Sequence, residues 1–223
     1  MGLLNEESFV KLVDHTLLSP LATEADIHQL CAETLKHNFF AVCIQPFHVR
    51  NAVQALKGSS VKVATVVNFP LANQIFSAVA HETECVLSLG ADEVDMVLRL
   101  SSVKSGDWGL VKEEVLKLKE ICGSRVLKVI LETGSLSVEE KVRACQICDE
   151  AGADFVKTST GFAGTGATIE DVVLMKKHFP RGIKASGGIR NLRTAEEMVS
   201  SGATRLGLSG SLDILRALRE RET

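Results

Sequence analysis

The sequence contains no tyrosine, and aromatic residues make up only 4% of its 223 residues. A phenol is therefore excluded as an acid or base in its chemistry. A strong charge of either sign is also missing, because 25 Lys and Arg residues face 28 Asp and Glu residues, for a net charge of −3. This balance argues against nucleic acid or a membrane surface as a partner. No apolar run approaches the length of a membrane span.

Metal-ligand and export patterns are missing as well. The six histidines show no H-x-x-x-H or similar spacing, so we predict neither a metal centre nor another cofactor. The N-terminal stretch MGLLNEESFVKLVDHT is acidic and has no long apolar segment, so we expect no signal peptide. The six scattered cysteines are then expected to be reduced thiols in the cytoplasm. Cys145 and Cys148 form a C-x-x-C on one helical face, and we expect them to pack in the core.

Short apolar runs alternate with longer amphipathic stretches along the chain. The strands are expected at residues 13–18, 40–44, 62–67, 93–98, 127–132, 155–158, 182–186 and 205–209. The main helices are expected at residues 24–37, 73–89, 109–121, 138–151, 168–178 and 194–201. Eight β-then-α units predict an α/β protein with a single (β/α)8 TIM barrel over residues 1–223 and a short N-terminal helix.

The residues at the helix ends agree with this organisation. Gly90, Gly152 and Gly202 each precede an alanine just before an expected strand, which suits a left-handed turn at the end of a helix. Ser137 with Glu140, and Thr194 with Glu197, have the spacing of capping boxes at helix starts.

Three lysines lie inside expected strands: Lys128 in VLKVILE, Lys157 in DFVKTST and Lys184 in GIKASGG. Their apolar neighbours have the opposite parity, so the lysines are expected to face the barrel interior. Lysine is rarely buried, and a buried amine can act as a nucleophile towards carbonyl compounds. The alternative is a purely structural salt-bridge network of these lysines with Asp14, Asp95 and Glu132.

Lys157 is the middle one of the three lysines. Neighbouring strands lie about 4.8 Å apart, so Lys128 and Lys184 can both disfavour its protonated form. With no side chain between Lys157 and Lys184 to screen their charges, we expect a free amine at Lys157 near neutral pH. Asp95 has the inward parity and is expected to shuttle protons, directly or through a water.

Glycine-containing turns follow the last three expected strands and predict a phosphate site. Backbone N–H groups in such turns bind anions, and barrels often hold phosphate after strands seven and eight. The residues concerned are Gly161 in TSTGF, Gly187 and Gly188 in SGGIR, and Ser209 and Gly210 in LSGSLDIL. The alternative is that these are plain tight turns.

Three further residues are weaker candidates. Asn68 in VVNFP could bind substrate or cap a turn. Cys43 is expected to be a buried structural thiol, and His15, with outward parity, to have a core or capping role.

Motifs along nearly the whole chain resemble one enzyme family, the 2-deoxyribose-5-phosphate aldolases. They occur in order from about residue 12 to 210: DHTLL, AVCIQP, VVNFP, GADEVDMV, LKVILETG, GADFVKTSTGF, GATIEDVVLM, KASGGIR and GATRLGLSG. The resemblance implies a class I aldolase without metal, acting in deoxyribonucleotide catabolism. It would reversibly cleave 2-deoxy-D-ribose 5-phosphate to acetaldehyde and D-glyceraldehyde 3-phosphate.

The resemblance also implies roles for individual residues. Lys157 stands at the Schiff-base position, and Lys184 and Asp95 belong to the proton relay. Lys128 and Asp14 stand at supporting polar positions, and Thr158 at a substrate-contacting one. Gly161, Gly187, Gly188 and Ser209 stand at phosphate-contacting positions.

The sequence departs from the family pattern in a few places. Ala72 replaces a common glycine, the loop after Phe162 differs, and Leu208 and Gly210 replace small or hydroxyl residues. Some members place a C-terminal tyrosine over the active site, which this sequence cannot do. Two alternatives therefore remain: another phosphate-binding barrel enzyme of the sugar-phosphate isomerase type, or a non-catalytic sugar-phosphate-binding barrel. The expected partner is a phosphorylated sugar substrate, and a homodimer is possible.

Overall fold

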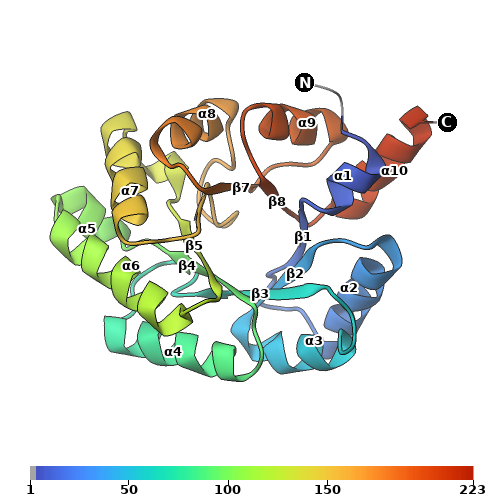
Figure 1. Ribbon diagram of the computed structural model, residues 1–223, viewed down its shortest axis with the longest axis horizontal. Coiled ribbons are helices and arrows are strands. Elements are labelled where there is room, and N and C mark those ends of the chain that lie inside the picture. The colour runs from blue at the N-terminus through green and yellow to red at the C-terminus, as the bar shows by residue number, and fades with distance from the viewer. Residues whose placement is uncertain (1–3, 223) are drawn as a thin grey trace.

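Eight parallel strands form a closed barrel in the computed structural model, which describes residues 4–222. Each strand pairs with its neighbours in the chain, and β8 pairs with β1 to close the ring (Figure 1). The strands are β1 (Val13–Leu17), β2 (Ala41–Ile44), β3 (Lys62–Val67), β4 (Glu93–Val97), β5 (Val126–Ile130), β6 (Phe155–Lys157), β7 (Gly182–Ser186) and β8 (Arg205–Leu208). The predicted (β/α)8 barrel is confirmed.

Helices surround the barrel, with α1 as the predicted N-terminal helix (Figure 1). The α-helices are α1 (Glu6–Val10), α2 (Glu24–His37), α3 (Val49–Ala55), α4 (Phe76–Ser88), α5 (Leu100–Ser105), α6 (Trp108–Cys122), α7 (Val138–Glu150), α8 (Ile169–His178), α9 (Leu192–Ser200) and α10 (Ser211–Glu222). Two 3-10 helices, η1 (Pro46–His48) and η2 (Thr133–Ser135), lie in loops. Within residues 4–222, no helix is long and apolar enough to cross a membrane.

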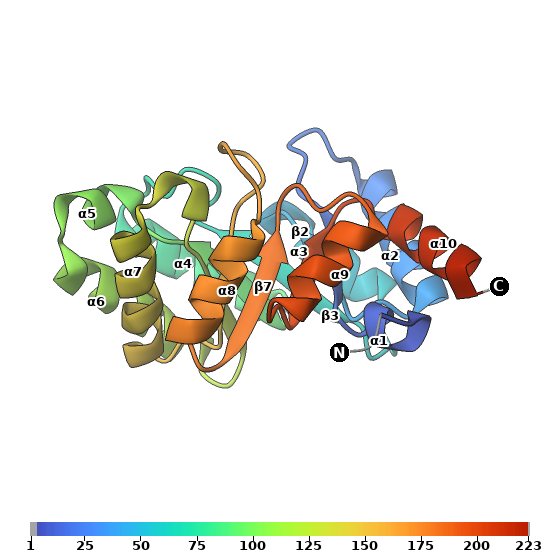
Figure 2. The same cartoon turned by 90° about the horizontal axis from the view of Figure 1, so that it is seen from above.

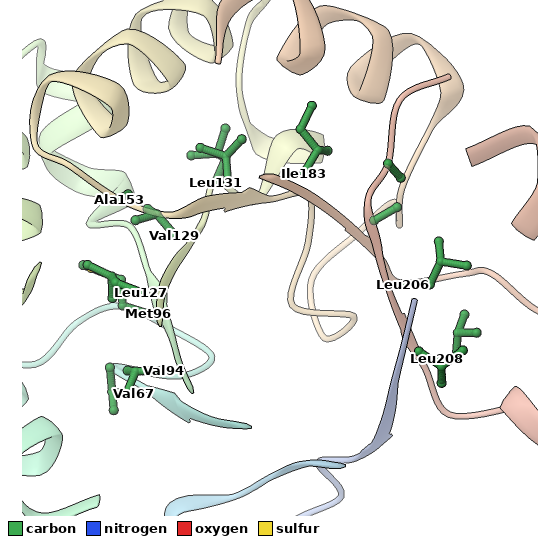
Figure 3. Close-up of a cluster of buried hydrophobic side chains, with 14 of the residues drawn as sticks. Val67, Val94, Met96, Leu127, Val129, Leu131, Ala153, Ile183, Leu206 and Leu208 are labelled. Atoms are coloured by element: carbon green, nitrogen blue, oxygen red, sulfur yellow. The ribbon is translucent and has the colours of Figure 1, made fainter. Parts of the chain in front are cut away.

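The alternation of side chains along the strands separates two environments. On β4 and β5, Val94, Met96, Leu127 and Val129 belong to the main hydrophobic core. Figure 3 shows these side chains pointing away from the centre of the barrel, towards the helices. The residues of opposite parity point inward, so the predicted inward placement of the lysines is confirmed.

The helix ends contain the predicted glycines and one of the two predicted capping boxes. Gly90, Gly152 and Gly202 have φ values of 105°, 80° and 119°, which only glycine adopts readily. Ser137 and Glu140 form the predicted capping box. The second predicted box was wrong. The N-cap of α9 is Asn191, whose side chain accepts a hydrogen bond from the backbone N–H of Thr194, so the N-cap lies three residues earlier than expected.

The two thiols of the C-x-x-C pair pack in the core, as predicted. Cys145 and Cys148 are both buried on α7. Burial raises the pKa of Cys145 to about 12 and that of Cys148 well above its ordinary value. Both are therefore neutral thiols at physiological pH.

The loops at the carboxyl ends of the strands rise together on one side of the molecule. Figure 2 shows β7 running towards this upper edge, where the loop between β1 and α2 and the loop between β6 and α8 stand out. The N-terminal helix α1 lies at the lower edge. In barrels of this kind the carboxyl ends of the strands carry the functional groups.

Candidate active site

A cavity of about 350 Å³ opens at the carboxyl ends of the strands. Lys157 and the predicted phosphate residues Gly161, Gly187, Gly188 and Ser209 line it. Its other walls come from residues that the sequence reasoning did not single out: Thr16, Leu17, Leu18, Ser19, Thr160, Phe162, Ser186, Ile189, Arg190 and Gly207. The cavity thus joins a lysine and glycine-rich turns in one space, as the sequence predicted.

Lys157 ends β6 and is 2% exposed. Its Nζ donates a hydrogen bond to Oδ2 of Asp95 at 2.9 Å. Lys157 is in register with Lys184 of β7, which brings the two lysines side by side on neighbouring strands. Of the three barrel lysines, Lys157 alone lines the cavity.

Asp95 is the hydrogen-bond acceptor for all three lysines. Its Oδ1 accepts from Lys128 at 2.6 Å, and its Oδ2 accepts from Lys157 at 2.9 Å and from Lys184 at 2.8 Å. Burial by itself would raise the pKa of Asp95, but the neighbouring lysines, Lys128 first among them, outweigh it and hold that pKa well below its ordinary value. Asp95 is therefore a carboxylate. The expectation that nothing screens Lys157 from Lys184 was wrong, because this carboxylate lies between them.

Lys184 and Lys128 are fully buried cations beneath the cavity. Burial opposes their charge, yet Asp14 and Asp95 raise the pKa of Lys184 well above its ordinary value. Asp95 and Glu93 raise the pKa of Lys128 in the same way. Lys184 hydrogen-bonds Asp14 as well as Asp95, and Lys128 lies 2.7 Å from Oε2 of Glu93. These two lysines are held as ammonium ions by paired carboxylates.

Asp14 connects these lysines to the lower part of the barrel. Burial by itself would raise its pKa, but Lys184, Lys128 and Arg205 together lower the pKa of Asp14 to about 2. Its Oδ1 accepts a hydrogen bond from Arg205 at 2.8 Å. The same guanidinium lies 3.2 Å from Glu93.

The salt-bridge network that the sequence suggested as an alternative therefore exists, with different members. Glu132 is not among its partners in the structure. That residue lies beyond the end of β5 with a φ of 54°, and its carboxylate accepts from the backbone N–H of Thr160 at 3.3 Å. Glu93 and Arg205 take part instead. Their positions inside expected strands pointed to them, since Glu93 has the same parity as Asp95.

The glycine turns form the upper wall of the cavity. Gly161, Gly187 and Gly188 have φ values of 84°, 88° and 77°, so each turn needs a residue that tolerates the left-handed region. A Cβ added at Gly166 would lie 2.2 Å from the carbonyl oxygen of Gly187, which shows how closely the two loops approach. Arg190 completes this wall from the end of the SGGIR motif, and a guanidinium suits phosphate geometry.

Like the residues of the charged network, Thr158 and Gly210 lie outside the cavity lining. Thr158 is fully buried, and its hydroxyl donates to the carbonyl of Ser186 at 2.9 Å and accepts from the N–H of Ser186 at 3.0 Å, which ties β6 to β7. Gly210 follows the cavity residue Ser209 but does not line the cavity itself. Their contacts with substrate and phosphate stay predictions.

The weaker candidates have structural contacts. Asn68 donates to the carbonyl of Val97 at 3.2 Å and accepts from the N–H of Gln74 at 3.3 Å, which favours turn capping. Cys43 is buried, and burial raises the pKa of its thiol. His15 points outward, as expected, and lies 2.9 Å from Glu33 of α2. Across the part of the chain that the structure describes, no three His, Cys, Asp or Glu side chains are grouped to hold a metal ion.

Comparisons with known proteins agree on one group of enzymes. Residues 9–217 match the model of the DeoC/LacD family aldolases. The chain is 48% identical over 207 residues to a deoxyribose-phosphate aldolase of Brevibacillus brevis, covering 92% of this chain and 94% of that relative. It is 50% identical over 214 residues to one from Thermoanaerobacter sp., covering 93% and 96%.

Solved structures of the same group of enzymes are also similar to this chain. The tetrameric deoxyribose phosphate aldolase from Aeropyrum pernix superposes with a TM-score of 0.92 and 31% identity, covering 97% of this chain and 93% of that one. The similarity therefore extends over nearly the whole chain.

Proposed function

The chain belongs to the DeoC/LacD family of aldolases, and we propose that Lys157 is the amine that forms the Schiff base in its reaction. The chain is a carbon–carbon lyase with deoxyribose-phosphate aldolase activity. It reversibly cleaves 2-deoxy-D-ribose 5-phosphate to acetaldehyde and D-glyceraldehyde 3-phosphate. One observation carries the assignment of the lysine: among the three lysines bonded to Asp95, only Lys157 reaches the cavity.

The reaction begins at the aldehyde carbon of the open-chain sugar. The free amine of Lys157 attacks C1, and loss of water gives an iminium ion. A base removes the proton of the C3 hydroxyl, the C2–C3 bond breaks, and its electrons pass to the iminium nitrogen as an enamine. Glyceraldehyde 3-phosphate leaves, the enamine takes a proton at C2, and hydrolysis releases acetaldehyde and the lysine.

Asp95 and Lys184 are suited to move the protons of these steps. Asp95 touches Lys157 and Lys184 through the same oxygen, at 2.9 and 2.8 Å. A proton leaving Lys157 can thus be passed to a carboxylate that is already bonded to a second cation. Lys128 and Asp14 support this arrangement by holding the remaining charges of the network.

The phosphate end of the substrate is assigned to the glycine turns. Gly161, Gly187, Gly188 and Ser209 lie in the same cavity as Lys157. Backbone N–H groups in such turns attract phosphate oxygens, and Arg190 supplies a positive charge beside them. The phosphate would then set the position of the aldehyde relative to Lys157.

Release of products from 2-deoxyribose 5-phosphate tests this function. The purified protein should release acetaldehyde and glyceraldehyde 3-phosphate in equal amounts, and Lys157→Met should lose at least about a thousandfold in kcat, as covalent catalysts do. An isomerase would instead convert the sugar without releasing acetaldehyde, and a binding protein would leave it unchanged. Full activity of Lys157→Met would refute the role of this lysine.

Three further expectations are part of the proposal. Residues 1–223 are taken as a single barrel domain, the location as the cytoplasm and the assembly as a homodimer. The relative from Aeropyrum pernix is described as tetrameric. Sedimentation equilibrium of the purified chain would show whether the homodimer is correct.

A further inference from the structure

Seven charged side chains form one continuous cluster inside the barrel, and only some of them lie near the cavity. Lys157 is at the upper end, bonded to Asp95. Glu93 is at the lower end, where it lines a hollow of about 230 Å³ at the opposite mouth of the barrel. The members are Lys128, Lys157, Lys184, Arg205, Asp14, Glu93 and Asp95.

The cluster contains more basic than acidic side chains. Four members are bases and three are carboxylic acids, so the fully charged cluster carries one net positive charge. It becomes neutral when one base gives up its proton. Net charge in a buried cluster is unfavourable, because the surrounding protein stabilises it poorly.

Only one of the four basic side chains can lose its proton at a low cost in free energy. An arginine guanidinium stays charged in proteins. Lys128 and Lys184 are fully buried, and they are paired with three and two carboxylates respectively. Lys157 has one carboxylate partner and faces the cavity. The charge count therefore favours a free amine at Lys157.

Resting on the proposed role of Lys157, we propose that Glu93 and Arg205 are positioning residues that set its protonation from the far end of the barrel. Neither lines the cavity. Glu93 is 3% exposed and lies 2.7 Å from Nζ of Lys128, which in turn bonds Asp95 at 2.6 Å. Arg205 lies between Glu93 and Asp14, at 3.2 and 2.8 Å.

The two residues act in opposite directions. The negative charge of Glu93 offsets one cation and so favours protonated Lys157, while the positive charge of Arg205 disfavours it. The groups facing Lys157 are Asp95 from β4, Lys184 from β7 and the thiol of Cys43 from β2. The groups facing Glu93 are Lys128 from β5 and Arg205 from β8, with Lys62, Asp92 and Arg125 around the lower hollow.

The size of the effect follows from the length of this chain of contacts. Glu93 and Lys157 are separated by no more than about 10 Å along it, and at an effective dielectric near 20 one charge at that distance shifts a titration by roughly 1 pH unit. Water screens Glu93 little, since it is almost fully buried. Asp92, its neighbour in the chain, carries the same charge but is half-exposed.

The experiment measures the pH dependence of imine trapping. Each variant is mixed with acetaldehyde and cyanoborohydride at a series of pH values, and mass spectrometry gives the initial rate of ethylation of Lys157. In Glu93→Gln the midpoint of this rate should move down by roughly 1 pH unit, and in Arg205→Gln it should move up by a similar amount. The conservative variants Glu93→Asp and Arg205→Lys keep the charge and should return the midpoint towards that of the unmodified protein.

Asp92→Asn is the matched control. It removes a negative charge beside Glu93, and its amide oxygen can still accept the hydrogen bond that Asp92 takes from the N–H of Val63. Its midpoint should stay in place. If Glu93→Gln does not fold, as a thermal melt would show, the Arg205→Gln and Arg205→Lys pair carries the test alone.

The experiment gives different results if the proposed function is wrong and if only this inference is wrong. Absence of any label on Lys157 in the unmodified protein would refute the proposed function itself. Labelling of Lys157 with the same midpoint in all variants would leave that function intact and overturn this inference, because Lys128 would then absorb the change of charge.

Discussion

Asp95 determines how the barrel lysines act, because it is the carboxylate that Lys128, Lys157 and Lys184 share. The parity of EVDMV was enough to place it inside the barrel. Its position between Lys157 and Lys184 was not predictable, since that depends on how far each side chain reaches across neighbouring strands. Glu132 shows the opposite case. Its parity pointed inward, but the strand ends at Ile130 and the backbone turns at Glu132 itself.

Lys184→Leu tests whether the second lysine keeps Lys157 reactive. The two ammonium groups bond the same oxygen and so lie within about 6 Å, where one charge at an effective dielectric near 20 is worth about 2 pH units. Without Lys184, Asp95 would favour the protonated form of Lys157. The midpoint of imine trapping should therefore move up by about that amount while kcat falls.

The exposed Lys57→Leu serves as the control for this variant. If kcat of Lys184→Leu falls while its trapping midpoint stays in place, Lys184 acts only as an acid–base group. Repulsion between the two ammonium groups would then not be what keeps Lys157 reactive.

The start of α9 shows how one residue fixes an element beside the cavity. Asn191 caps this helix directly after the loop that contains Gly187, Gly188 and Arg190. The sequence offered Thr194 and Glu197 as a plausible capping box one turn later. Local spacing could not decide between them, because both starts are compatible with the apolar pattern of the helix.

Replacing each candidate residue in turn tests which of them caps α9. Asn191→Ala should lower the free energy of unfolding by about 1 kcal/mol, because the N–H of Thr194 loses its acceptor. Thr194→Ala should change it by less than about 0.5 kcal/mol, since alanine is a good helix former within the first turn. Urea denaturation of both variants gives the two values, and a larger loss for Thr194→Ala would restore the capping box that the sequence suggested.

The loop between β7 and α9 carries the second element-scale prediction. Gly188 lines the cavity with a φ of 77°, and a Cβ there would have its nearest neighbour 3.9 Å away, at Gly166. Gly188→Asp should lower kcat/KM for 2-deoxyribose 5-phosphate by at least about a hundredfold, through charge repulsion of the phosphate. Turnover of unphosphorylated 2-deoxyribose should change far less.

Gly188→Asn separates charge from backbone strain, because asparagine has nearly the same shape and tolerates the left-handed region. It should retain much more activity on the phosphorylated sugar than Gly188→Asp does. Equal loss in the two variants, or equal loss on both sugars, would place the phosphate elsewhere.

The barrel as a whole was predictable because its pattern repeats. Eight segments with apolar residues on one face alternate with helical stretches, and each added unit supports the same closed sheet. The short helices α3 and α5, of 7 and 6 residues, were missed because two turns contain too few residues to show a helical period. The strand positions of Glu93 and Arg205 were a usable signal, but which groups they pair with depends on contacts across the barrel interior.

The buried charges also make the stability of the molecule depend on pH. The folded state lowers the pKa of Asp14 to about 2, below its ordinary value of 3.8. Its contribution is therefore present above about pH 4 and is lost as the pH falls towards 2. The loss amounts to about 2 kcal/mol over this window.

Asp14→Asn tests this dependence. The variant should be less stable at pH 7, because Lys184 and Arg205 lose a charged partner. Its free energy of unfolding should also fall less between pH 5 and 2 than that of the unmodified protein. Identical slopes in urea titrations over this range would show that Asp14 does not carry the acid sensitivity.

Lys157 is proposed as the covalent nucleophile of this aldolase. Incubation with acetaldehyde and cyanoborohydride at neutral pH, followed by proteolysis and mass spectrometry, tests this claim most directly. We expect the peptide that contains Lys157 to gain an ethyl group before the exposed lysines do, and we expect none on that peptide when cyanoborohydride is left out. Modification of Lys128 or Lys184 with Lys157 unlabelled would contradict the claim.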